Sequence, residues 1–158
     1  MAMSNIVKSY LDLKGVPFDL RPHPITGSTS HQTAIAAHIE EDHLAKAVLL
    51  KRDWEYLMVV VPADRTVKLD SIAKVMGQPY EVAPKTSAEA LLKDCKPGAI
   101  PPVGHAYGVQ TLVDSSLDNL SDIYFEAGDH EHLVHVDGAN FQYMFSNCQH
   151  GNFSSHAN

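Results

Sequence analysis

A loop rich in glycine and proline is the part of this chain whose residue types point most directly to chemistry. Residues 96–104 read KPGAIPPVG. Proline fixes φ and lacks a backbone N–H, whereas glycine allows positive φ and a close approach to a ligand. The N–H groups of Gly98, Ala99 and Ile100 lie between the prolines, and consecutive free amides of this kind can bind an anion or an oxyanion. A Pro/Gly cluster is often a plain turn, but this one predicts a site formed by backbone donors.

A single lysine in an apolar segment is the second candidate. Residues 44–50 read LAKAVLL, which is typical of a buried strand, and Lys46 lies near its start. Taken alone, Lys46 is more simply a side chain whose ammonium reaches water from an edge strand. Beside a loop of free backbone donors, however, it would supply a fixed positive charge. Lys51, at the end of the same segment, is expected to be an exposed surface group.

Cysteines and histidines give no clear metal site. The two cysteines, Cys95 and Cys148, show no C-x-x-C spacing and indicate reduced thiols rather than a disulfide framework. On a strand His130 and His132 would share a face and His135 would not, so a closed zinc site is not expected. We predict that the protein holds no metal and needs no cofactor.

The elements that must position these residues alternate irregularly between helix and strand. Ser4 can cap a first helix that Gly15 ends, and Ser30 can cap a second that reaches about residue 39. Further helices are expected from Asp70 to residue 76, after a capping box at residues 86–89, and from Gly138. Strands are expected at residues 16–20, 45–51, 56–61, 80–83, 109–114, 123–127 and 132–136, the second and third forming a hairpin. This order favours an α+β fold over a Rossmann sheet.

Together, these features resemble the YbaK and prolyl-tRNA editing domain family of aminoacyl-tRNA deacylases. The resemblance rests on the G-x-x-x-P loop from Gly98 to Pro102, the strand lysine upstream of it, the His23-Pro24 pair, and the opening segment at residues 11–18. It implies a mixed, mainly antiparallel, partly closed six- or seven-stranded sheet flanked by helices. Residues 1–146 would form this single YbaK-like editing domain, and residues 147–158 a polar, frayed C-terminal tail.

The resemblance also assigns roles to residues. Lys46 would engage the acyl-adenosine end of the tRNA, the loop amides would stabilise the oxyanion, and a terminal hydroxyl of the tRNA would help to position the water. The residues so implied as catalytic are Lys46, Gly98, Ala99, Ile100 and Pro102. Those implied to bind substrate are His23, Ser30, Pro101, Gly128 and His130, although His23 and His130 could equally be ordinary turn and surface residues.

Charge and composition limit the partners. The 158 residues include 12 Lys and Arg against 19 Asp and Glu, a net charge of −7, whereas proteins that grip nucleic-acid backbones usually carry a basic stripe. We therefore expect the protein to contact the aminoacyl-tRNA 3′ end rather than the whole tRNA, and not to bind DNA. An aminoacyl-tRNA synthetase could deliver the tRNA to it. No apolar run is long enough to span a membrane and the N-terminus lacks a signal pattern, so a cytoplasmic location is expected.

The function predicted from these observations is trans-editing, the hydrolysis of mischarged aminoacyl-tRNA. The amino acid would be small, and alanine, serine, threonine, proline and cysteine all remain open because selectivity depends on the depth of the pocket. Two alternatives stay in place. A catalytically silent relative could use the same cleft to bind a ligand or regulate, and an unrelated hydrolase could act on small esters without the adenosine.

Overall fold

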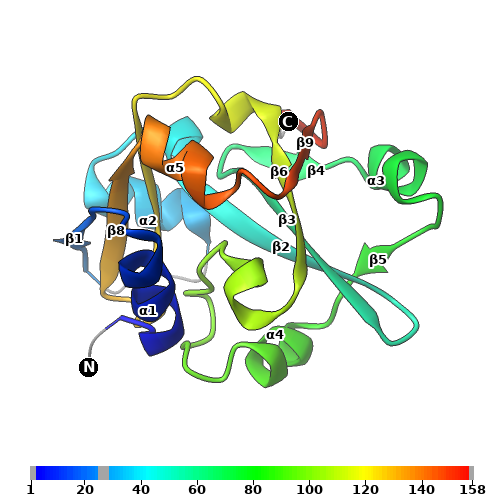
Figure 1. Cartoon of the computed structure of the whole chain (residues 1–158), viewed down its shortest axis with the longest axis horizontal. Helices are drawn as coiled ribbons and strands as arrows, with labels where there is room; N and C mark the ends of the chain where they lie inside the picture. Colours follow the sequence, from blue (N-terminus) through cyan, green and yellow to red (C-terminus); the bar gives the residue numbers. More distant parts are fainter. Residues whose placement is uncertain (1–2, 25–28, 157–158) are drawn as a thin grey trace.

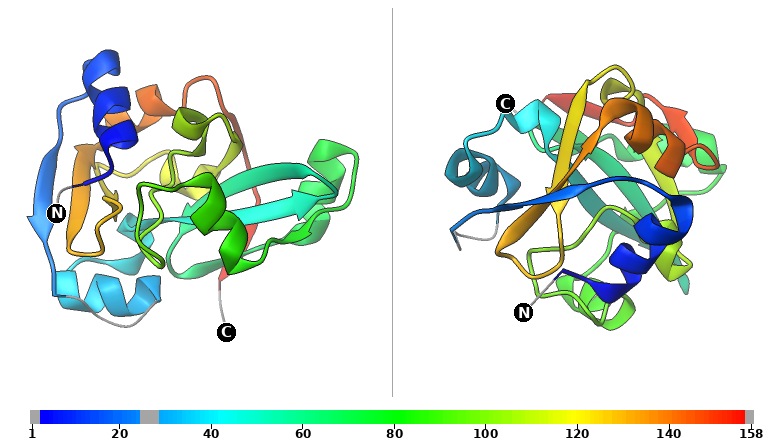
Figure 2. Two further views of the ribbon diagram at one scale, coloured as in Figure 1. Left: turned by 90° about the horizontal axis from the view of Figure 1, so that it is seen from below. Right: turned by 60° about the vertical axis from the view of Figure 1, so that its left-hand side comes forward.

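The strands of this protein divide among three sheets, which Figures 1 and 2 show from different sides. The computed structural model describes residues 3–24 and 29–156. Its strands are β1 (Asp19–Pro22), β2 (Ala45–Arg52), β3 (Glu55–Pro62), β4 (Arg65–Val67), β5 (Glu81–Val82), β6 (Gln110–Asp114), β7 (Asp122–Glu126), β8 (His132–Asp137), β9 (Gln149–Gly151) and β10 (Ser154–His156). Its α-helices are α1 (Asn5–Lys14), α2 (Ser30–Ala37), α3 (Leu69–Met76), α4 (Lys85–Leu91) and α5 (Gly138–Met144), with 3₁₀ turns η1 (Glu41–His43), η2 (Gly104–Tyr107) and η3 (Ser115–Leu117).

The largest sheet is mixed and contains the strand with the lysine. Its order is β5-β2-β3-β6-β9, with β2 antiparallel to both neighbours and the β3–β6 and β6–β9 pairs parallel. A second, antiparallel sheet has the order β1-β8-β7, and β4 pairs with β10. A parallel bridge between Leu44 and Tyr124 joins the start of β2 to β7. The α+β class is confirmed, but the expected single sheet of six or seven strands is wrong, and the described strands form no closed barrel.

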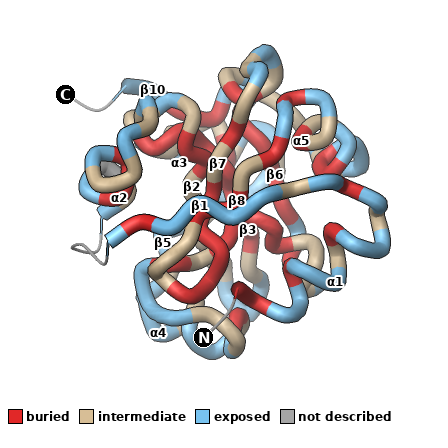
Figure 3. Tube along the Cα trace, turned by 90° about the vertical axis from the view of Figure 1, so that its left-hand side faces the viewer, coloured by how far each residue is buried: buried red, intermediate tan, exposed pale blue. Residues whose placement is uncertain are grey.

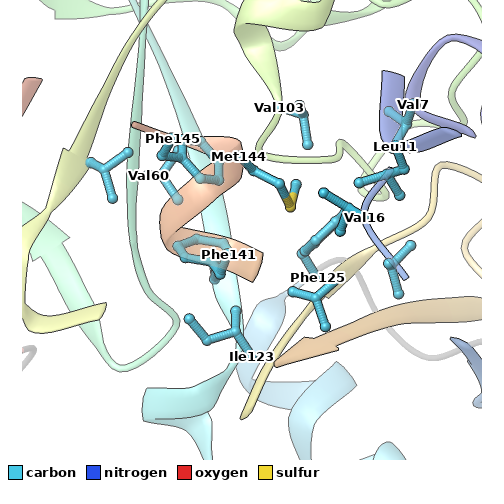
Figure 4. Close-up of a cluster of buried hydrophobic side chains, with 14 of the residues drawn as sticks. Val7, Leu11, Val16, Val60, Val103, Ile123, Phe125, Phe141, Met144 and Phe145 are labelled. Atoms are coloured by element: carbon cyan, nitrogen blue, oxygen red, sulfur yellow. The ribbon is translucent and has the colours of Figure 1, made fainter. Parts of the chain in front are cut away.

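The main core lies between the two larger sheets and is closed by α1 and α5. Val7 and Leu11 of α1, Phe125 of β7 and Phe141 of α5 belong to one buried cluster, most of which Figure 4 shows in close-up. Val103, which follows the Gly/Pro loop, belongs to it too. Figure 3 shows that buried residues gather where β3, β7 and β8 lie, whereas β1 is exposed along its length. Packing against this core therefore holds the loop between rigid elements.

Local signals in the sequence predict some helix ends correctly and others not. Ser4 caps α1 by accepting the Val7 N–H, and Gly15 ends it at φ 68°, as predicted. The N-cap of α2 is Thr29 rather than the predicted Ser30, because Thr29 and Gln32 form a reciprocal capping box. The box predicted at residues 86–89 is wrong, since α4 already begins at Lys85 after Pro84.

The C-terminal segment is not the frayed tail that its polar composition suggests. β9 extends the main sheet beside β6, and β10 pairs with β4. The reason is Phe153, which is 1% exposed and packs in a second core cluster with residues of β3 and β6. Its N–H donates to Asp114 and its carbonyl accepts from the Lys68 N–H at 2.7 Å.

The first strand also differs from the prediction. It lies at Asp19–Pro22 rather than at residues 16–20, because Val16 is buried in the core.

Candidate active site

The lysine strand and the Gly/Pro loop meet at a small pocket. It encloses about 150 Å³ and is lined by Ser30, Leu44, Ala45, Lys46, Ala47, Gly98, Ile100 and Glu126. The segment after α4, which carries the loop, runs past β2 on this side of the molecule (Figure 2). Four residues singled out from the sequence, Lys46, Gly98, Ile100 and Ser30, are thus brought together although they come from separate parts of the chain.

The first turn of the loop fixes which amides are free. The Ala99 N–H donates to the Lys96 carbonyl at 3.1 Å, and Gly98 has φ +80°. Pro97 cannot adopt positive φ, so this is a type II turn with Pro97 and Gly98 in its centre. The expected set of three free amides is therefore wrong for Ala99, which is also fully buried. Among the described residues, the N–H groups of Gly98 and Ile100 have no acceptor.

The prolines of the loop lie inside the protein rather than in the pocket. Pro101 and Pro102 are buried, as are Ala99 and Val103 on either side of them. The second half of the loop is therefore a core segment, not the lightly packed surface turn that its composition suggests. This packing, together with the restricted φ of proline, keeps Gly98 and Ile100 at a fixed place on the pocket wall.

Lys46 borders the pocket in a half-buried position. Its Nζ donates to the Ala63 carbonyl at 3.4 Å. Burial lowers the pKa of the Lys46 ammonium, while the carboxylates of Asp64 and Glu41 act in the opposite direction. The lysine is thus a positive charge with few competing contacts, placed at the edge of the pocket by the β2–β3 pairing that puts it opposite Val61.

A buried polar network anchors the start of the loop. Asp94 accepts hydrogen bonds from Tyr107 at 2.6 Å and from Ser4 at 2.7 Å. Burial opposes ionisation of Asp94, but these hydrogen bonds outweigh it and lower the pKa of the carboxyl. Burial also raises the pKa of the neighbouring Cys95 thiol to about 12, so Cys95 stays protonated at neutral pH. The network was not foreseen, because its members come from distant parts of the sequence.

Gly128 belongs to this anchor and not to the pocket wall. Its carbonyl accepts from the Lys96 N–H at 2.7 Å, and its φ is +105°. A Cβ at this position would lie 3.1 Å from Ser4 Cβ and 3.2 Å from Cys95 Sγ. The glycine is needed because the loop, the N-terminus of α1 and the end of β7 come together here.

His23, His130 and Glu126 lie together, and Glu126 is the member of this group that lines the pocket. The His23 imidazole is fully buried, and its Nε2 lies 3.5 Å from Oε1 of Glu126. The His23 and His130 ring centroids are 6.2 Å apart. The nearby Glu126 carboxylate raises the pKa of His23 although burial acts against it. Sequence reasoning missed Glu126, which reaches the pocket from the end of β7.

The remaining histidines give no alternative chemistry. No group of three or more His, Cys, Asp or Glu residues in the described part of the chain is arranged to hold a metal ion. His132 bonds to Asp129, and His135 lies between Asp19 and Asp122 with both distances 2.7 Å. Within residues 3–24 and 29–156, no helix has the length and apolar character needed to cross a bilayer. Among the described residues that line the pocket, the polar groups are backbone donors, Lys46, Ser30 and Glu126.

Comparison with known proteins identifies the family of the chain. The aminoacyl-tRNA editing domain profile matches residues 26–143, most of the chain including both walls of the pocket. The chain belongs to the aminoacyl-tRNA editing domain family, and the resemblance to YbaK-like editing domains is confirmed. No curated protein matches the chain.

Solved structures show the same fold at low sequence identity. The hypothetical protein APE2540 superposes with a TM-score of 0.84 at 18% identity, over 96% of this chain and 100% of that one. A protein described as a candidate trans-editing enzyme for prolyl tRNA synthetase gives 0.81 at 17% identity, over 96% of both chains. A signal transduction protein from Marinobacter aquaeolei VT8 gives 0.73 at 18%, over 94% of this chain but 30% of its own. The fold therefore occurs both alone and within longer chains.

Proposed function

We propose that this protein is a cytoplasmic trans-editing hydrolase that removes a wrongly attached small amino acid from tRNA. The observation that carries the proposal is the pocket of about 150 Å³ in which Lys46, Gly98 and Ile100 lie together. Its size suits a side chain such as that of alanine, serine, threonine, proline or cysteine. It does not suit a whole nucleotide, so the adenosine of the tRNA end would lie outside it.

The chemistry follows from the donors available. Water attacks the ester carbonyl, the carbonyl oxygen becomes an oxyanion, and the bond to the ribose oxygen then breaks as that oxygen takes a proton. The Gly98 and Ile100 N–H groups are free to donate to the oxyanion, whereas the Ala99 N–H is already used within the turn. Lys46 would add positive charge beside the ester and hold the ribose-phosphate end of the substrate. No nucleophilic side chain is required, because aminoacyl esters are already activated.

A deacylation panel tests the proposal. Mischarged tRNAs carrying each of the five small amino acids are incubated with the wild type, Lys46→Ala and Lys51→Ala, beside correctly charged controls. Lys51 lies on the same strand but does not line the pocket, so it is the matched control. We expect turnover on at least one mischarged tRNA, loss of it in Lys46→Ala, and little change in Lys51→Ala.

Two results would contradict this proposal. Equal turnover by the wild type and Lys46→Ala would remove the lysine from the mechanism. Binding of aminoacyl-tRNA without hydrolysis of any substrate would instead identify the protein as a silent member of its family. Circular dichroism of Lys46→Ala separates a catalytic loss from unfolding.

A further inference from the structure

Glu126 has a buried carboxylate oxygen whose hydrogen-bonding capacity the protein itself does not satisfy. The residue is 8% exposed, ends β7, and is one of the residues that line the pocket containing Lys46. Its Oε1 is buried and has no hydrogen-bond partner among the described residues. An ionised carboxylate left in this state costs free energy unless a donor reaches it.

The protonation state of His23 decides whether the protein itself compensates this oxygen. His23 Nδ1 lies 2.9 Å from the Pro24 carbonyl, which can only accept, so Nδ1 carries the proton. In neutral His23 the other nitrogen, Nε2, is then an acceptor, and it faces Glu126 Oε1 at 3.5 Å. Neither atom has a hydrogen-bond partner, and their 3.5 Å contact is an ion pair only when His23 is protonated; Nε2 of His130, on the adjacent ring, has no hydrogen-bond partner either.

The missing group must therefore be a donor, and preferably a cation with several N–H groups. A protonated His23 can supply one proton to Glu126 in the empty pocket. An ammonium in the pocket can donate to the carboxylate as well. An aminoacyl ester carries such an ammonium on the carbon next to its carbonyl, so a pocket with Lys46 at one wall and Glu126 at another has charges of the matching signs.

Building on the proposed deacylation, we infer that Glu126 is a specificity-determining residue that binds the α-ammonium group of the aminoacyl ester. The pocket then selects for esters with a free α-amino group and against those with a neutral or blocked one. A charged hydrogen bond lost from a buried site reduces kcat/KM by about 10- to 100-fold.

The test compares two nearly isosteric substrates, alanyl-tRNA and lactyl-tRNA, in which a hydroxyl replaces the ammonium. Each enzymatic rate is divided by the spontaneous hydrolysis rate of its ester. The wild type should prefer the alanyl ester by about 10- to 100-fold in kcat/KM. Glu126→Gln should lose that preference because its kcat/KM falls for the alanyl ester and not for the lactyl ester. Glu131→Gln, which alters a nearby carboxylate outside the pocket, should keep it.

Binding measurements keep this inference separate from the proposed function. Titration of the non-hydrolysable amides 3′-alanylamino-adenosine and 3′-lactylamino-adenosine reports the same discrimination even where no turnover occurs. Weaker alanyl binding in Glu126→Gln, with unchanged lactyl binding, supports the role of Glu126. Equal affinity of the wild type for the two amides, or an equal loss on both in the variant, overturns it. Absence of turnover with intact discrimination contradicts only the hydrolysis.

Discussion

Replacing Gly98 by alanine tests the backbone mechanism without removing any catalytic side chain. Gly98 is the third residue of the type II turn and has φ +80°, where an L-residue is disfavoured by about 1–2 kcal/mol. The turn can relieve this strain by rotating its central peptide, which converts it to type I. That peptide carries the Gly98 N–H, so the relief turns one of the two free donors away from its present direction.

The structure gives different magnitudes for activity and for stability. Losing one oxyanion donor costs about 100- to 1000-fold in kcat. The cost in unfolding free energy is limited to the strain of about 1–2 kcal/mol, and less if the peptide rotates. KM should change little, because the donor acts mainly in the transition state.

Single-turnover deacylation and thermal unfolding of Gly98→Ala measure the two effects. Gly77→Ala is the matched control: Gly77 has φ +73°, a Cβ there would meet nothing within 4 Å, and it ends α3, outside the pocket. We expect both variants to lose similar stability and only Gly98→Ala to lose the chemical step. A rate for Gly98→Ala within about twofold of the rate for Gly77→Ala would refute the reasoning and leave the loop as a structural turn.

Three further predictions concern charge, pH and the C-terminus. Because the net charge is −7, the slope of log affinity for tRNA against log salt concentration should correspond to no more than about two phosphate contacts. A minimal acceptor-stem mimic should bind as well as full tRNA. A slope that corresponds to about six or more phosphate contacts would contradict this prediction. Burial opposes protonation of His135, but its bonds to Asp122 and Asp19 outweigh burial and raise its pKa, so the stability it contributes is complete below about pH 6.5 and is lost as pH rises through the folded value. Urea unfolding at pH 5.5 and 8.5 should show a smaller loss of stability in His135→Gln than in the wild type, because His23, whose pKa is also raised, still contributes in the variant. Phe153→Ala should lower the free energy of unfolding by about 3–5 kcal/mol. Tyr143→Ala, which removes a half-exposed ring, should lower it far less. Equal losses in the two variants would mean that the C-terminal strands contribute nothing to stability.

Several features of this protein follow from short stretches of its sequence. The cap at Ser4, the stop at Gly15 and the β2–β3 hairpin depend on residues within a few positions of one another, and each forms as predicted. Lys46 and the Gly98 loop are recognisable for the same reason, since one cation in an apolar strand and one Gly/Pro cluster are local patterns. Both line one pocket, and both lie within residues 26–143, which the family profile matches.

Other features were decided by contacts between distant segments. Glu126 is a carboxylate at the end of a strand, which in sequence resembles a solvent-facing residue; it reaches the pocket because β7 lies beside the start of β2 through the Leu44–Tyr124 bridge. The Ala99 amide is used up by a turn whose hydrogen bond the composition of the loop does not reveal. Phe153 packs in a core cluster whose other members lie far upstream in the sequence, and this packing holds the polar C-terminal residues in two strands. Local sequence determines which groups are available, whereas burial and pairing across the chain determine which of them face the pocket.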